Sequence, residues 1–173
     1  SHGWIDFRGV QDAFMRAHDW HYFENGRRAT PVQQQYGIRN PGAFAQYGES
    51  HWGITASDGP GKVRRTVGGV KRKFFGYLAR GVPYGPDDGT LAPWGVIASL
   101  PFAPDIVLSS IAAMRRLPIG GDDHPYGFRS TYNPSFLQPG RTPGWWVAPA
   151  HCGTTQGTIW GTSANNVPER VGE

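Results

Sequence analysis

The chain has a single cysteine, few charged residues and no long apolar run. The lone Cys152 excludes an intramolecular disulfide, and no group of cysteines has the spacing of metal ligands. We therefore expect no metal site and no cofactor. No stretch approaches the roughly 20 apolar residues that a membrane helix needs, so we also expect no membrane partner.

A start signal is also missing. The chain begins with Ser1 instead of Met, and no charged segment followed by an apolar one opens it, as a secretory leader would. The sequence therefore predicts a piece of a longer protein.

Glycine and proline are abundant, at 25 and 15 of 173 residues, so long uninterrupted elements are not expected to dominate. Aromatic residues make up 13% of the chain. Disordered segments are poor in groups that can be buried, so this content indicates a folded protein. The length fits one domain, which would bury roughly 70% of its unfolded surface.

The basic residues are concentrated in two short segments, residues 62–65 and 71–73, in a chain of net charge +4. Such clusters attract anions, although a solvated loop is the simpler interpretation. A nucleic-acid surface is a further alternative, but the acidic residues lie in the same loops, so we expect no nucleic-acid partner.

The first half of the chain predicts two helices followed by long loops. Apolar residues at helical spacing indicate a short helix over 9–17 and a second over 25–40. Pro31 favours either a kink in the second helix or a start at Thr30 as its N-cap. Residues 41–92 are rich in glycine and proline and predict irregular loops with one hairpin at most.

The second half predicts a pair of helices over 91–100 and 104–117, each opened by a proline. A weak helix is expected over 155–165. Alternation typical of strands is not evident. Short helices separated by long loops indicate an all-α fold.

One loop, residues 47–60, combines acidic and aromatic residues: it contains Glu49, Trp52 and Asp58. Sugar sites use this combination, because aromatic faces stack on pyranose rings and carboxylates accept hydrogen bonds from hydroxyls. The alternative is structural: Glu49 caps a helix or pairs with an arginine, and Trp52 belongs to the core.

Three further segments place acids beside aromatic residues or glycine: Asp6 and Arg8 in WIDFRG, Glu24 in YFENGRR, and Asp88 in DDGTLAP. Together with the 47–60 loop, and in this order, they resemble the glycoamylase-like family, which includes glycoside hydrolase family 144 endo-β-1,2-glucanases. The resemblance extends over residues 1–160. It departs from the family after Gly153, where the usual Asp and Glu are absent.

The resemblance implies the C-terminal half of an (α/α)6 barrel, so that residues 1–173 form an incomplete domain whose N-terminal half is missing. It implies a glucan as partner, and a periplasmic or secreted location. The family's catalytic acids lie in motifs that this chain lacks, so we expect no catalytic residue here and no activity of the chain alone. The residues expected to line the glucan groove are Asp6, Arg8, Glu24, Glu49, Trp52, Asp58 and Asp88.

The expected function is thus the substrate-groove wall of a glycoside hydrolase that acts on β-glucan, such as β-1,2-glucan. The alternative is a carbohydrate-binding remnant without turnover, which would use Trp4, Trp52 and Trp145. That remnant would bind glucan saturably and release no reducing ends.

Overall fold

The computed structural model describes residues 2, 5–120, 125–151, 153 and 157. Trp4 and nearly all of the predicted 155–165 helix lie outside these residues. The elements run in the order α1 (Ala13–Ala17), α2 (Tyr22–Arg39), β1 (Val63–Val67), β2 (Val70–Phe74), α3 (Pro93–Ile97), α4 (Pro104–Met114), β3 (Tyr132–Leu137) and β4 (Trp145–Val147).

The expected all-α fold is wrong, because β1 pairs with β2 and β3 with β4 in two antiparallel sheets. Neither sheet shows the alternation of apolar and polar residues that identifies a half-buried strand. β3 is buried at its first five positions, and the first four positions of β1 are exposed. The described chain is therefore a mixed α and β structure and not an all-α half-barrel.

The long helix α2 begins eight residues before Thr30. His21 is its N-cap and accepts a hydrogen bond from Glu24 N, at 3.3 Å. Pro31 lies inside the helix, and the Thr30 hydroxyl donates to Gly26 O at 3.0 Å, so Thr30 is not a cap. The helix ends at Asn40 in the left-handed conformation, which confirms the predicted stop.

The predicted hairpin is formed by β1 and β2. Their register pairs Val67 with Val70, so that Gly68 and Gly69 form the turn. Both glycines have positive φ, +57° and +78°, as a two-residue hairpin turn of the right twist requires.

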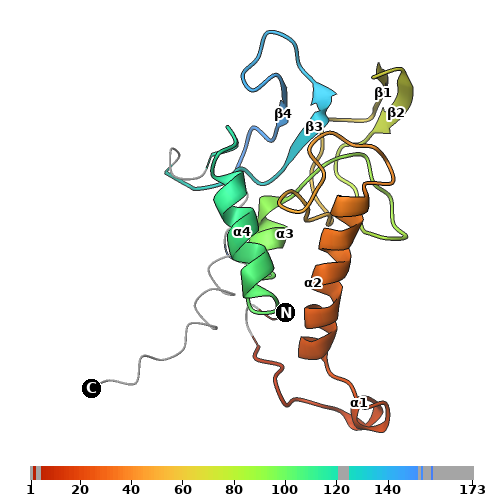
Figure 1. The fold of residues 1–173 in the computed structure, drawn as a ribbon, viewed down its shortest axis with the longest axis vertical. Coiled ribbons are helices and arrows are strands. Elements are labelled where there is room, and N and C mark those ends of the chain that lie inside the picture. The colour runs from red at the N-terminus through yellow and green to blue at the C-terminus, as the bar shows by residue number, and fades with distance from the viewer. Residues whose placement is uncertain (1, 3–4, 121–124, 152, 154–156, 158–173) are drawn as a thin grey trace.

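The two prolines start α3 and α4 as predicted, although both helices end earlier than the pattern indicated. In Figure 1 α4 lies beside α3, and α2 runs along the other side of the molecule. No helix in the described part of the chain is long and apolar enough to cross a membrane.

The core lies where the loop 47–54, α3, α4 and β3 meet. Trp52 exposes 1% of its surface, and its indole Nε1 donates to Ser110 Oγ at 2.9 Å. Around it pack the buried side chains of Tyr47, Ile54, Leu91, Val96, Val107, Met114, Ile119 and Tyr132. The structural interpretation of Trp52 as a core residue is therefore the observed one.

Candidate functional site

Two adjoining hollows follow α2 toward its N-terminal end. The larger, of about 220 Å³, lies between α2, the 52–55 loop and α3. The smaller is a depression beside the start of α2, lined by His2, Ile5, Asp6, Arg8, Phe23, Pro101 and Phe102. Because Phe102 lines both, we treat them as one feature, the α2 groove.

Small residues make room for the α2 groove. A Cβ atom on Gly26 would lie 2.8 Å from Phe102 Cε1, so only glycine lets this ring approach α2 so closely. On the opposite wall, a Cβ atom on Gly53 would lie 2.7 Å from Val96 Cγ2. The width of the groove therefore depends on two glycines that face bulky neighbours.

The 52–55 loop is fixed to α2 by Gln33. Its Nε2 donates to Ile54 O at 3.2 Å, and Ile54 N donates to Gln33 Oε1 at 2.9 Å. This pair of bonds holds the loop as one wall of the groove. Hydroxyl groups of Thr30, Thr55 and Ser99 add polar atoms to the same lining.

One carboxylate, Asp6, lines the N-terminal end of the groove, and a second, Glu24, lies in the first turn of α2 outside the lining. Asp6 pairs with Arg8 at 2.9 Å, and Glu24 pairs with Arg27 at 3.1 Å and with Arg28 at 3.0 Å. The hydrogen bond from Arg8 lowers the pKa of Asp6, and that from Arg28 lowers the pKa of Glu24. Both carboxyl groups are therefore ionised at neutral pH and are acceptors only.

His2 lies in the same depression, where burial is the main cause that lowers its pKa. Its imidazole is consequently neutral at pH 7 and can both donate and accept a hydrogen bond.

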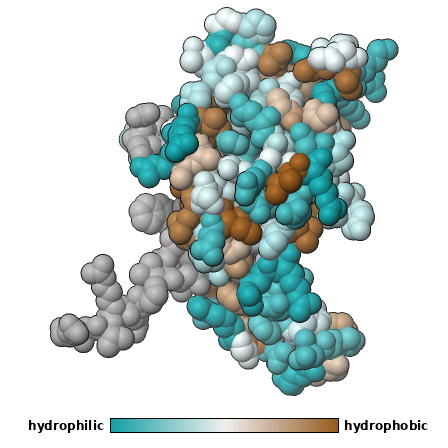
Figure 2. Space-filling view, viewed as in Figure 1, coloured by the Kyte–Doolittle hydropathy of each residue, from teal (hydrophilic) through white to brown (hydrophobic). Residues whose placement is uncertain are grey.

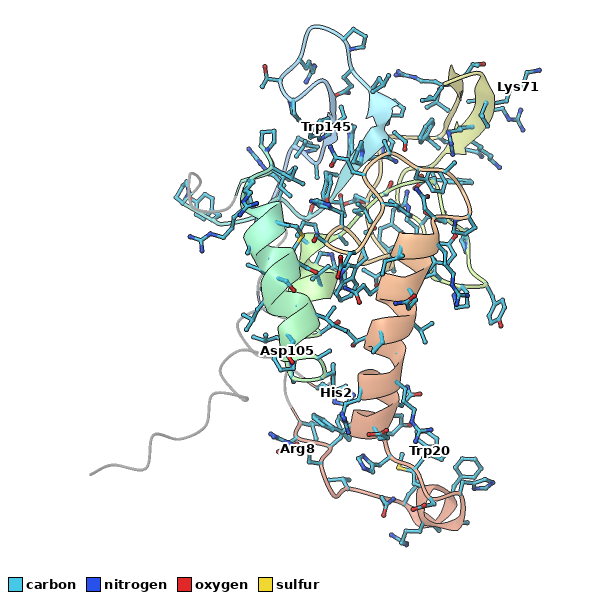
Figure 3. The ribbon with its side chains drawn as sticks, viewed as in Figure 1. His2, Arg8, Trp20, Lys71, Asp105 and Trp145 are labelled. Atoms are coloured by element: carbon cyan, nitrogen blue, oxygen red, sulfur yellow. The ribbon has the colours of Figure 1, made fainter. Side chains whose placement is uncertain are left out.

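Aromatic rings continue the groove toward α1. Each ring lies within about 6.4 Å of the next, centroid to centroid, in the order Phe23, Phe102, His2, Phe7, Tyr22, Trp20, Phe14 and His18. Tyr22 and Phe14 are 46% and 59% exposed, so the far end of this run offers open ring surface. Figure 3 shows Arg8 and Trp20 together at this end of the molecule.

Of the seven residues predicted to bind glucan, the structure brings Asp6 and Arg8 together in the smaller hollow. Glu24 lies in the first turn of α2 and lines neither hollow. Trp52 is one of the groove-lining residues, but its ring is almost entirely buried and has no free face for a sugar.

Asp88 lies in the interior, 1% exposed. Arg80 Nε donates to its Oδ1 and Arg80 Nη2 to its Oδ2, each at 2.8 Å, and Phe75 N and Thr90 N also donate to the carboxylate. These donors occupy the carboxylate, which has a structural role.

Glu49 and Asp58 are exposed and lie outside the α2 groove. Their backbone carbonyls accept hydrogen bonds from Gln34 Nε2, at 2.9 Å, and from Thr131 Oγ1, at 3.0 Å. Gln34 is ten residues beyond Glu24 on α2, which is about 15 Å along the helix axis. Glu49 is therefore well separated from the Asp6 and Glu24 carboxylates.

Comparison with known proteins places the chain in a family. The family model Glycoamylase, described as "Putative glucoamylase", matches residues 1–171. The chain belongs to this family.

Among curated proteins, the glycoamylase-family chain is 30% identical, over 138 residues, to an exo beta-1,2-glucooligosaccharide sophorohydrolase (non-reducing end) of Parabacteroides distasonis. The match covers 80% of this chain and 16% of that protein.

Solved structures show the same fold. A "putative glucoamylase" of Bacteroides uniformis matches 95% of this chain and 33% of its own length, with a TM-score of 0.71 and 27% identity. A beta-1,2-glucanase of Parabacteroides distasonis matches 84% of this chain and 18% of its own length, with a TM-score of 0.64 and 30% identity. The chain thus spans at most about a third of these relatives.

Sequence reasoning missed one carboxylate of the glycoamylase-family chain, Asp87. Tyr47 OH donates to its Oδ1 at 2.8 Å and Tyr36 OH to its Oδ2 at 3.2 Å. Burial is the main cause that raises the pKa of Asp87, and burial next to this carboxylate raises the pKa of Tyr36 to about 12. The segment Asp87-Asp88-Gly89 indicates a site with acidic residues, but the sequence does not show that Asp88 is the one buried with an arginine.

Proposed function

We propose that this chain supplies part of the substrate-binding wall of a glycoside hydrolase that acts on β-glucan, with β-1,2-linked glucan as the substrate class. Membership of the glycoamylase family supports the enzyme class, and the sophorohydrolase and glucanase relatives support the linkage. The observation that carries the proposal is the α2 groove, where aromatic rings and the ionised carboxylate of Asp6 line one continuous surface.

The chemistry of the α2 groove suits a neutral sugar. Rings such as Phe102 and Phe23 present apolar surface against which pyranose C–H groups pack, while Asp6 accepts hydrogen bonds from hydroxyls. Arg8 keeps Asp6 in place through a bifurcated hydrogen bond, with 2.9 Å and 3.0 Å from Nε to the two carboxylate oxygens. A preorganised acceptor loses less entropy when a ligand binds.

The groove carboxylate is assigned to binding and not to proton transfer. A general acid of a glycosidase needs a raised pKa so that it still carries its proton at the working pH. Asp6 has a lowered pKa, which favours an acceptor that stays ionised. We accordingly assign no catalytic residue to this chain, and we expect it to turn over no glucan by itself.

The test measures binding of β-1,2-glucooligosaccharides by titration calorimetry to the wild type and to Gly26→Ala. The added methyl group displaces the Phe102 ring, so we expect affinity to fall at least about ten-fold, the equivalent of about 1.4 kcal/mol. Gly81→Ala is the matched control, because a Cβ atom at Gly81 meets nothing within 4 Å. Unchanged affinity of Gly26→Ala would place the sugar elsewhere.

Two charge-neutralising variants locate the sugar along α2. Asp6→Asn should weaken binding, because Asp6 lines the groove, whereas Glu49→Gln should leave it unchanged. The reverse pattern would move the site to the loop near the C-terminal half of α2, where Glu49 and Asp58 remain available for a longer glucan.

The alternative, a carbohydrate-binding chain without any catalytic partner, makes the same binding predictions. An assay for reducing ends on the longest available form of the protein separates the two. Hydrolysis by that form supports the hydrolase, and binding without hydrolysis supports the non-catalytic alternative.

A further inference from the structure

The β1–β2 hairpin carries a concentrated positive charge. Between Asp58 and Asp87 the sequence contains seven lysines and arginines and no carboxylate. Six of the seven lie in or beside the hairpin, and one, Arg80, is buried in the ion pair with Asp88. The hairpin therefore has no acid of its own to balance its charge.

The cations on the two faces of the hairpin have different surroundings. On the inner face Arg65 donates to Leu137 O at 2.9 Å and lies over the Phe136 ring at 3.9 Å from its centroid. Arg72, its cross-strand partner, donates to Gly42 O at 2.8 Å and to Ala43 O at 2.7 Å. These two arginines anchor the hairpin to the body of the molecule.

The outer face consists of Arg64, Thr66, Lys71 and Lys73, since cross-strand partners and alternate residues share a face. All four are exposed. Arg64 lies directly opposite Lys73, and like charges in that position destabilise a sheet. In the described part of the chain no carboxylate forms an ion pair with any of these three cations. The outer face thus holds an uncompensated positive charge in a fixed geometry.

The tip of the hairpin is apolar. Val67 and Val70 flank the Gly68–Gly69 turn and continue the inner face of Arg65 and Arg72, and Val70 is 51% exposed. The hairpin projects from one end of the molecule in Figure 1, and Figure 3 shows Lys71 there, at the end opposite Arg8 and Trp20. Figure 2 shows hydrophobic and strongly hydrophilic residues side by side at this end.

We propose that the outer face of the β1–β2 hairpin binds the surface of a bilayer that contains anionic phospholipids. Lysine and arginine attract phosphate headgroups, and three exposed cations without an acidic neighbour fit a surface that presents many such headgroups. A projecting hairpin reaches a planar surface while the α2 groove, at the other end, stays free for glucan.

A nucleic acid fits this face less well. Binding of single strands combines cations with exposed aromatic faces on which the bases stack. The ring of Phe75, which follows β2 directly, is covered by Lys73 Nζ at 4.8 Å from its centroid. The expectation of no membrane partner came from the absence of a spanning segment, and binding to a surface needs none.

The test is co-sedimentation of the chain with vesicles of phosphatidylglycerol and phosphatidylcholine, compared with vesicles of phosphatidylcholine alone. We expect binding to the anionic vesicles only, weakening as salt is raised. Each cation near such a surface strengthens binding about five-fold, so Arg64→Gln/Lys71→Gln should weaken it about 25-fold, and adding Lys73→Gln should bring the loss to about 100-fold. The double variant leaves the contact between Lys73 and Phe75 intact.

The matched control removes the same charge elsewhere, through Arg39→Gln/Arg116→Gln/Arg141→Gln, and should bind within about three-fold of the wild type. All three of these arginines are exposed. Equal losses in the control and the hairpin variant would show that net charge alone drives binding and would overturn the proposal. So would no sedimentation of the wild type with anionic vesicles, or binding of a single-stranded oligonucleotide as tight as that of the vesicles at equal salt.

Discussion

The two ends of the molecule hold their arginines in opposite ways. At the groove end Arg8 is exposed and pairs with an exposed carboxylate, with 51% and 54% of the two side chains accessible to solvent. At the hairpin end Arg80 is fully buried against Asp88, and Arg72 donates to two backbone carbonyls. The groove end can rearrange around a ligand at little cost, whereas the hairpin end is fixed by contacts that stability depends on.

The largest expected effect comes from breaking the buried pair with Arg80→Met. Besides Asp88, Arg80 donates to the carbonyls of Ser57, Phe75 and Gly76, so its loss leaves a buried carboxylate without its cation and three carbonyls without this donor. Removing one partner of a buried ion pair costs about 3–5 kcal/mol. We expect this loss in the free energy of unfolding, measured by urea denaturation.

A double variant separates the lost charge partner from the lost packing. Arg80→Met/Asp88→Asn should be more stable than Arg80→Met alone, because the amide carries no uncompensated charge and still accepts from Phe75 N. A double variant less stable than the single one would contradict this account of the pair.

A smaller effect separates the two faces of the hairpin. Arg72→Met should lower the free energy of unfolding by about 1–3 kcal/mol, because the variant loses the two hydrogen bonds to carbonyls and the contact of its guanidinium with Phe44, 4.6 Å from the ring centroid. Lys71→Met, on the outer face of the same strand, should change it by less than about 0.5 kcal/mol. Equal losses would mean that both faces are structural, which would weaken the case for a free outer face.

Local signals in the sequence predicted local structure well. Asn40 marked the end of α2, Pro93 and Pro104 marked the starts of α3 and α4, and Gly68–Gly69 allowed one hairpin in the long loop region. Each of these depends on the conformation of one or two residues, which the residue type constrains directly.

Features that depend on tertiary contacts could not be predicted in the same way. β3 contains a proline, and its first five residues are buried. Its pairing with β4 is irregular, and there the Asn133 side chain contributes hydrogen bonds, because its Oδ1 accepts from Ser135 N and Phe136 N. Likewise, only the fold decides that Asp88 is buried against Arg80 while Asp87 is held by two tyrosines. The resemblance correctly identified the family, but the all-α fold, which both the helix pattern and the resemblance indicated, was wrong for this chain.

The Asp87 carboxylate tests the hairpin end through pH. The pKa of Asp87 is higher in the folded protein than in the unfolded chain. As the pH rises, the unfolded chain therefore loses this proton first, and the contribution of Asp87 to the free energy of unfolding decreases. Asp87→Asn removes that fall. We expect the variant to melt close to the wild type near pH 3 and slightly above it near pH 7, in a series of thermal melts. Identical profiles for both proteins would show that burial of Asp87 carries no cost.

The smallest effect is expected at the groove end, from Arg8→Met. The hydrogen bond from Arg8 lowers the pKa of Asp6 in the folded protein. A carboxylate with a lowered pKa stabilises the fold at pH values above its pKa in the unfolded chain, and this contribution is lost as the pH falls through its pKa in the folded protein. Because the pair is exposed and screened by solvent, we expect no measurable change in the melting temperature at any pH. The pKa of Asp6, followed by NMR titration of its carboxyl carbon, should nevertheless rise toward its ordinary value. A clear drop in melting temperature would show that the groove end is as dependent on its ion pairs as the hairpin end, and would remove the contrast between them.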